Sequence, residues 1–159
     1  MAQESQKGVK HIVCAVRGAP ESRSTVNRAI ELALESGARL TFFHAVDAEF
    51  LAYATVAPLS LVHRELHEMG VFLMMILCDR ARRRGVAEVE HVVREGNVKK
   101  LLRQMARESD ADILVMGRPS RRSRRSLFKE KEFETFVPEL EREGRFKVEV
   151  VTHLPQAET

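Results

Sequence analysis

The sequence predicts a single α/β domain, built on an open, mostly parallel sheet of five strands with helices on both faces. Strand-like and helix-like segments alternate from one end of the chain to the other. Two of the strand-like segments are apolar throughout, as expected for parallel strands that helices cover on both faces. The connections are short, which fits right-handed crossovers between parallel strands. No repeat or linker interrupts the pattern, so residues 1–159 are expected to form one domain.

The strands are recognised by apolar runs or by alternation. The first run stops just before Gly18 and the fourth stops at Gly117, and neither has a polar face. The third shows apolar residues alternating with polar ones. The predicted strands are residues 12–16, 40–46, 86–93, 113–117 and 146–152.

The helices are recognised by apolar residues at helical spacing and by their end signals. A glycine closes each of the first two helices, and the pair Gly96-Asn97 precedes the third, where asparagine is a favoured N-cap. Pro138 predicts a kink or an early break in the fourth. The predicted helices cover about residues 22–36, 58–84, 98–109 and 129–143.

The composition is that of a soluble globular protein, with 44% hydrophobic and 31% charged residues. Cys14 and Cys78 lie far apart in apolar surroundings and match no metal-ligand spacing, which predicts buried thiols in a reducing compartment and no metal site. The N-terminus lacks the apolar core of a signal peptide. The longest apolar run, residues 71–78, is far shorter than the roughly 20 residues of a spanning helix. We therefore expect a cytoplasmic protein without membrane insertion.

The positive charge is concentrated in one segment. Residues 118–129 contain no acidic residue, and removing their six basic charges from the total of +3 leaves −3 for the rest of the chain. We expect residues 117–128 to form a basic, anion-facing loop and the ends, about 1–8 and 155–159, to be loose. The basic residues are Arg118, Arg121, Arg122, Arg124, Arg125 and Lys129.

Two long stretches resemble the universal stress protein family. Residues 12–47 (IVCAVRGAPESRSTVNRAIELALESGARLTFFHAVD) resemble its first strand, helix and second strand, and residues 92–120 (VVREGNVKKLLRQMARESDADILVMGRPS) its third strand, helix and fourth strand. A glycine-led helix, an Asp-Ala-Asp turn and a Val-Met-Gly strand end carry the resemblance. It implies a Rossmann-like fold of the adenine nucleotide alpha hydrolase-like type, and a homodimer through the last strand. The candidate dimer residues are Phe146, Val148 and Val150.

The family's ATP-binding pattern is not kept. Members that bind ATP carry an aspartate after the first strand, where this chain has Arg17. They also carry Gly-x-x-Gly, nine residues and Gly-Ser/Thr after the fourth strand. Here Gly117 matches the first glycine, Ser120 replaces the second, and the last pair falls at Glu130-Lys131. We therefore assign no cofactor and do not expect ATP to bind in the usual family manner.

Ligands of doubly wound sheets bind beyond the carboxyl ends of the strands. Arginine side chains there could hold a phosphate by their forks in place of a glycine-rich backbone. The candidate ligand-binding residues are Val16, Arg17, Gly18, Ala45, Gly117, Arg118, Ser120, Arg121 and Arg122.

Two functions stay open from the sequence. The first is a regulatory or interaction module in stress response, with an unidentified protein partner and without the family's ATP site. The alternative is a module that binds a nucleotide or another phosphate ligand through Arg17 and the 118–125 arginines. No catalytic residue is assigned, because no nucleophile is placed beside a base. Nucleic acid is not expected as a partner, because no aromatic residue is interleaved with the arginines.

Two further groups of polar residues are interpreted as structural. His63 and His67 share a helix face, but Arg64 stands where a metalloprotease helix needs glutamate, so they are expected to be surface or interface histidines. Asp110 and Asp112 are expected to form a helix-to-strand turn at the end of the sheet opposite the ligand crevice.

Overall fold

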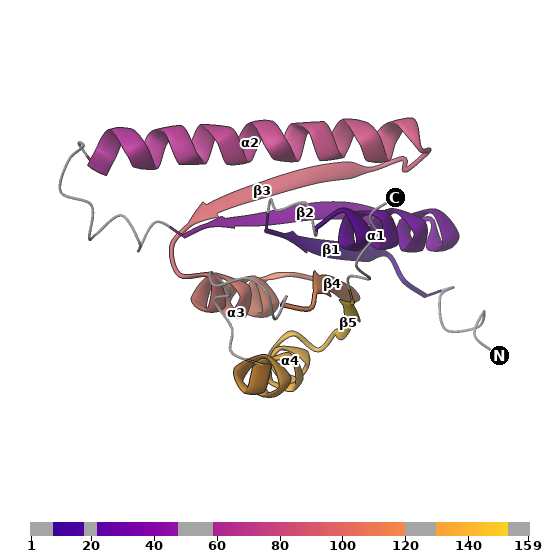
Figure 1. Cartoon of the computed structure of the whole chain (residues 1–159). Coiled ribbons are helices and arrows are strands. Elements are labelled where there is room, and N and C mark those ends of the chain that lie inside the picture. Colours follow the sequence, from indigo (N-terminus) through magenta and orange to yellow (C-terminus); the bar gives the residue numbers. More distant parts are fainter. Residues whose placement is uncertain (1–7, 18–21, 48–58, 120–129, 153–159) are drawn as a thin grey trace, which may run out of the picture.

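The computed structural model describes residues 8–17, 22–47, 59–119 and 130–152. Its centre is a five-stranded sheet in the order β3-β2-β1-β4-β5, and all four neighbouring pairs are parallel (Figure 1). The predicted open α/β sheet is confirmed. The strands are β1 (His11–Val16), β2 (Arg39–Val46), β3 (Val89–Glu95), β4 (Ile113–Gly117) and β5 (Lys147–Val151).

Two helices cover each face of the sheet (Figure 1). The chain first moves outward from β1 to β3, so right-handed crossovers place α1 and α2 on one face. It then returns to β4 and continues to β5 on the other side of β1, which places α3 and α4 on the opposite face. The helices are α1 (Ser22–Ser36), α2 (Leu59–Arg83), α3 (Val98–Glu108) and α4 (Glu130–Gly144).

The core has two halves, one on each side of the sheet. Successive strand residues point to opposite faces, so in β1 Ile12 and Cys14 pack with α1 and α2, while Val13 packs on the α3–α4 side. Both faces of β1 and β4 are buried, which explains why these two strands are apolar throughout. Cys14 and Cys78 are buried free thiols, as predicted.

One predicted boundary is wrong. The third strand begins at Val89 rather than at residue 86; Val86 is instead a buried residue just after α2. The fourth helix covers nearly the predicted residues, and Pro138 does not break it early. Phe136 and Leu140 are buried on either side of the proline, and their packing offsets the cost of about 3 kcal/mol that an internal proline carries. Within the described residues, no helix is both long and apolar enough to cross a membrane.

Candidate functional site

The candidate site lies at the carboxyl edge of the sheet, where β1 and β4 are neighbours. Strand order reverses between these two strands, because the chain leaves β1 toward one face and β4 toward the other. Ligands of doubly wound sheets bind at such a point. Arg17 directly follows β1 and Arg118 directly follows β4. The two strands pair Ala15 with Met116, and that register continued by two residues puts Arg17 level with Arg118.

The two arginines place positive charge at neighbouring strand ends. Neighbouring strands lie about 4.8 Å apart, and both Arg17 and Arg118 are exposed. Within the described ranges, the Arg118 guanidinium has no hydrogen-bond or ion-pair partner. Two exposed guanidinium groups at adjacent strand ends make this edge a place that an anion can approach.

The backbone after β4 has no N–H groups to offer a ligand at its first two positions. The N–H of Arg118 donates to the carbonyl oxygen of Val151 at 2.9 Å, and so extends the β4–β5 pairing by one bond. Pro119 has no N–H. A phosphate cradle needs consecutive free N–H groups, and residues 118–119 do not provide them.

Gly117 is required by packing rather than by a phosphate. Its φ lies outside the left-handed region. A Cβ at this position would lie 2.9 Å from Oγ1 of Thr25, which is only 3% exposed on the inner side of α1. The glycine therefore lets α1 approach the end of β4.

The end of β2 completes the described edge. Ala45 is half-buried and packs on the α3–α4 side. His44 Nδ1 donates to the carbonyl oxygen of Val16 at 2.7 Å; because a carbonyl only accepts, Nδ1 carries the proton. The ring also packs on Gly70 of α2, where a Cβ would lie 2.9 Å from His44 Cδ2. His44 therefore holds β1, β2 and α2 together.

Four of the predicted ligand residues lie outside the described residues. They are Gly18, Ser120, Arg121 and Arg122, together with most of the expected basic loop. Their assignment stays a prediction. Among the predicted residues that the structure describes, it brings together Val16, Arg17, Ala45, Gly117 and Arg118 at one edge.

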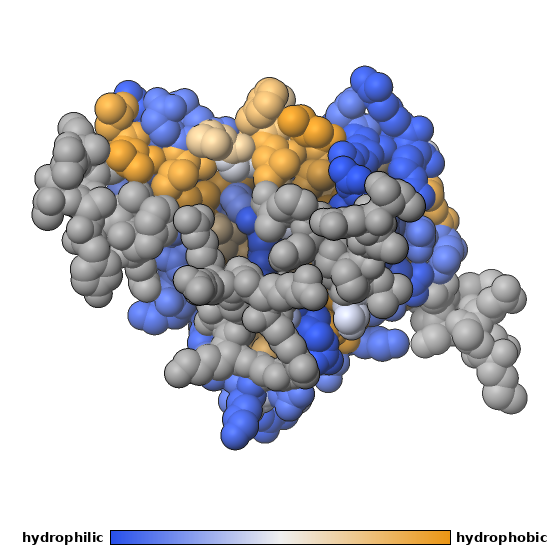
Figure 2. All heavy atoms as spheres, in the orientation of Figure 1, coloured by the Kyte–Doolittle hydropathy of each residue, from blue (hydrophilic) through white to orange (hydrophobic). Residues whose placement is uncertain are grey.

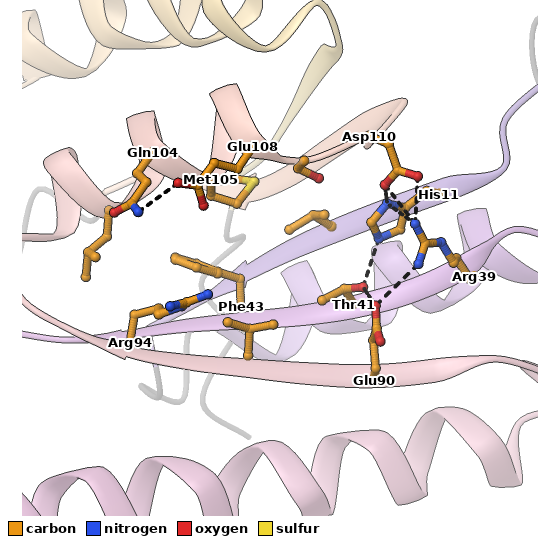
Figure 3. A pocket seen from close by; sticks show the side chains of 14 residues that line it. His11, Arg39, Thr41, Phe43, Glu90, Arg94, Gln104, Met105, Glu108 and Asp110 are labelled. Atoms are coloured by element: carbon orange, nitrogen blue, oxygen red, sulfur yellow. Dashed lines mark hydrogen bonds and ion pairs between the residues drawn. The ribbon is translucent and has the colours of Figure 1, made fainter.

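A polar cluster lies at the opposite, amino edge of the sheet (Figure 3). His11 is only 6% exposed; its Nδ1 lies 2.8 Å from Oδ1 of Asp110 and its Nε2 2.8 Å from Oγ1 of Thr41. Arg39 Nη2 donates to both Asp110 oxygens at 2.7 and 2.8 Å. Thr41 donates its hydroxyl proton to Glu90 at 3.0 Å, so its oxygen accepts from the histidine.

The cluster stabilises the ionised form of Asp110. The hydrogen bond from His11, followed by the attraction of Arg39, holds the pKa of the Asp110 carboxyl below its usual value. Asp112 Oδ2 accepts from the backbone N–H groups of Lys10 and His11 at 2.8 and 3.0 Å. Both aspartates therefore tie the α3–β4 turn to the start of β1, and their predicted structural role is confirmed.

A cavity of about 320 Å³ lies beside this cluster, between α3 and the exposed half of β2 and β3 (Figure 3). It does not reach the arginines of the carboxyl edge. Its polar rim is largely occupied by the ion pairs just described, so the cavity identifies no ligand. Its apolar lining consists of Val13, Phe43, Val92, Leu101 and Met105.

The predicted dimer residues lie at β5, which is an edge strand. Phe146 and Val148 are only 6% and 8% exposed and pack in the α3–α4 half of the core, which Val150 also joins. These side chains point to the inner face that α4 covers, so they are not free to contact a partner strand. Glu149, on the other face, accepts from Arg28 of α1 at 3.1–3.3 Å. Dimerisation through β5 stays a prediction, and the outer backbone of the strand would carry it.

The paired histidines of α2 face the end of β3. Nδ1 of His67 lies 3.2 Å from Glu95, and Nδ1 of His63 lies 4.0 Å from the same carboxylate. The His67 contact has ion-pair distance but not hydrogen-bond geometry. Among the residues that the structure describes, no group of three or more histidine, cysteine or acidic residues could hold a metal ion.

Comparisons with solved structures agree with this fold. A universal stress protein family member from Burkholderia pseudomallei matches with a TM-score of 0.66 and 24% identity, covering 90% of this chain and 96% of that one. A universal stress protein in complex with cAMP gives 0.61 and 22%, with coverages of 92% and 98%. One from Arabidopsis thaliana with AMP bound gives 0.58 and 16%, with coverages of 92% and 93%.

The sequence itself decides the family. A search of the curated proteins finds no match, and the structural neighbours are too distant in sequence to show more than the fold. The family model described as "Universal stress protein family" matches residues 8–129, well over half of the chain. The chain belongs to the universal stress protein family.

Proposed function

We propose that this protein is a regulatory or interaction module of the stress response that does not hold ATP in the usual family manner. The observation that carries the proposal is the backbone after β4. The N–H of Arg118 is already bonded to Val151, and Pro119 has none. A phosphate at this position would therefore lack the backbone donors of a glycine-rich loop.

The residue after β1 supports the same proposal. The ATP-binding members that this chain resembles carry an aspartate there, and this chain carries Arg17. A carboxylate accepts hydrogen bonds, whereas a guanidinium only donates them. A ligand hydroxyl or amino group that donates to the aspartate would therefore lose its acceptor.

Binding is supported better than catalysis. Cys14 lies near the edge, but its burial raises the pKa of the thiol far above the ordinary value. The Nδ1–H of His44 is committed to the Val16 carbonyl. The Cys14 thiol contacts the Thr25 carbonyl and the His44 ring contacts the Val16 carbonyl. Within the described parts of the carboxyl edge, these two groups therefore do not pair as a nucleophile and its base.

A second candidate function is the binding of a phosphate ligand by arginine side chains. The observation that favours it is the level placement of Arg17 and Arg118 at adjacent strand ends. Arginine forks bind phosphate bidentately and need no backbone nest. Two structural neighbours were solved with cAMP and with AMP, so an adenine nucleotide is the first ligand to try.

Calorimetric titration of nucleotide-free protein with ATP and ADP, with and without magnesium, separates the two candidates. The absence of heat up to about 1 mM ligand supports the interaction module. Micromolar binding that Arg17→Ala or Arg118→Ala weakens supports the phosphate ligand, and Arg121→Ala tests the predicted loop contact. Arg107→Ala is the matched control, because Arg107 is an exposed arginine at the other end of the sheet.

We also propose that copies of the chain pair through β5. In the described residues β5 has a strand partner on one side only, β4, so its outer backbone edge can pair with another strand. Proline within the strand would remove ladder donors on that edge.

A further inference from the structure

Helix α2 has an apolar face on each side. Its inner side is anchored on the sheet, with Met74, Leu77, Cys78 and Ala81 at most 6% exposed. Its outer side carries a second set of large apolar residues, and Figure 2 shows them gathered along the helix. Their exposed fractions are 46% for Leu61, 65% for Met69, 67% for Phe72, 55% for Met75 and 44% for Ile76. We refer to these five residues as the outer face of α2.

A helix that is apolar on both sides is normally covered on both. At roughly 200 Å² for one large apolar side chain, the exposed fractions amount to about 500 Å² of apolar surface. That is the size of the largest patches on typical monomers, about 300–600 Å², which are often contact sites. The outer face is therefore expected to be an interface.

The charges at the two ends of this face differ in sign. Glu65 and Glu68 precede the apolar centre, and both are exposed. Asp79, Arg80 and Arg83 follow it and are also exposed. Arg83 Nε donates to Asp79 at 2.8 Å, so this ion pair is neutral and Arg80 keeps the end basic. Residues that recur every three or four positions share one helix face, so the acidic end, the apolar centre and the basic end lie in line.

We propose that a second copy of this chain docks on the outer face of α2, with the two helices antiparallel about a two-fold axis that passes between Phe72 and Ile76. A two-fold interface brings the same surface of both copies together, so the surface must complement itself. The antiparallel arrangement places the acidic end of each helix opposite the basic end of the other. A parallel arrangement would place glutamate on glutamate and arginine on arginine.

The area and position of the face fit this assembly. A stable interface buries about 800 Å² per partner, and the apolar centre together with the four flanking charged side chains approaches that value. Helix α2 covers β2 and β3, whereas β5 is at the far edge of the sheet. The α2 contact therefore does not compete with pairing through β5.

Replacing the centre of the face tests the contact. Phe72→Glu places a charge beside the axis and should weaken association at least ~30-fold, as for a central interface residue. By light scattering the molar mass should fall to half that of the wild type. Leu34→Glu is the control, since Leu34 is an exposed leucine of α1 outside the face, and it should keep the wild-type mass. The proposal is overturned if the wild type is monomeric at about 100 µM or if Phe72→Glu leaves the mass unchanged.

A charge exchange tests the antiparallel arrangement. One double variant, Glu65→Arg with Glu68→Arg, makes both ends basic; the other, Arg80→Glu with Arg83→Glu, makes both ends acidic. Each alone should lose the association, because like charges then face each other. An equal mixture should recover it as a mixed pair, with unchanged circular dichroism throughout. Self-association of either variant at wild-type strength, or failure of the mixture to associate, would overturn the antiparallel arrangement.

Discussion

At the amino edge of the sheet, Arg39 donates to both oxygens of Asp110, and His11 lies between that carboxylate and Thr41. At the carboxyl edge, Arg118 has no such partner among the described residues. The same residue type thus closes a network at one end of the strands, and at the other end Arg118 is exposed to solvent. The paired amino edge contributes to stability, and at the carboxyl edge the exposed Arg118 retains the capacity to attract a ligand.

The largest effect is expected at the paired edge. His11→Ala leaves Thr41 and Asp110 without their histidine partner and opens a buried space, while Arg39 still links Glu90 to Asp110. It should therefore lower the free energy of unfolding by about 2–3 kcal/mol. Urea denaturation measures this. Arg107→Ala, an exposed control, should change it by less than about 0.5 kcal/mol. Equal free energies of unfolding for the two variants would show that the His11 network does not stabilise the amino edge.

At the carboxyl edge, packing rather than charge is expected to set stability. Gly117→Ala should cost about 1–3 kcal/mol, because the added Cβ would lie 2.9 Å from Thr25 Oγ1. Thr25→Ala removes that oxygen, so the cost of Gly117→Ala should be smaller in the Thr25→Ala background. A double-mutant cycle in urea measures the coupling, and strict additivity would contradict the packing explanation.

The paired edge should also respond to acid. Because the folded pKa of Asp110 is lowered by His11 and then by Arg39, its contribution to stability is present above its unfolded pKa and is lost as pH falls through the folded pKa. The wild type should therefore lose stability below about pH 4 more steeply than Asp110→Asn. Denaturation at a series of acidic pH values checks this; identical slopes would mean that the ion pair is not formed in solution.

The smallest effect on stability is expected for Arg17→Ala and Arg118→Ala. Both side chains are exposed, so each variant should unfold within about 0.5 kcal/mol of the wild type. Any phosphate ligand should nevertheless bind more weakly to them, and more weakly to the wild type as salt is raised. A large loss of stability in the Arg118→Ala variant would show that Arg118 belongs to a structural network.

The sequence located the strands that are buried on both faces, because nothing else produces a short run such as residues 113–117 without a polar residue. It was less reliable where a strand is at an edge. Phe146 and Val148 are apolar in either case, and only the three-dimensional position of α4 shows that they point inward. Of the kink or early break predicted at Pro138, the early break does not occur, because local propensity does not register the packing of α4 on the sheet.

The candidate site was predicted only in part, for a physical reason. That Arg17 and Gly117 reach one edge follows from parallel strands, so the pattern was sufficient. The pairing of His11 and Arg39 with Asp110 joins residues that are 99 and 71 positions apart. The sequence signal for this network is a basic residue at the start of β1 and of β2, together with an aspartate before β4. The hydrogen bond from the Arg118 N–H to the Val151 carbonyl oxygen could not be predicted, because no sequence pattern indicates it.

The backbone after β4 should not cradle phosphate, and calorimetric titration with magnesium ATP measures this. The decisive sample has alanine in place of Arg17 and of the 118–125 arginines, because these changes remove the candidate side-chain donors and leave the backbone N–H groups in place. We predict no heat from this variant up to about 1 mM ATP. Micromolar binding that persists in this variant would contradict the prediction, because the backbone would then be holding the phosphates.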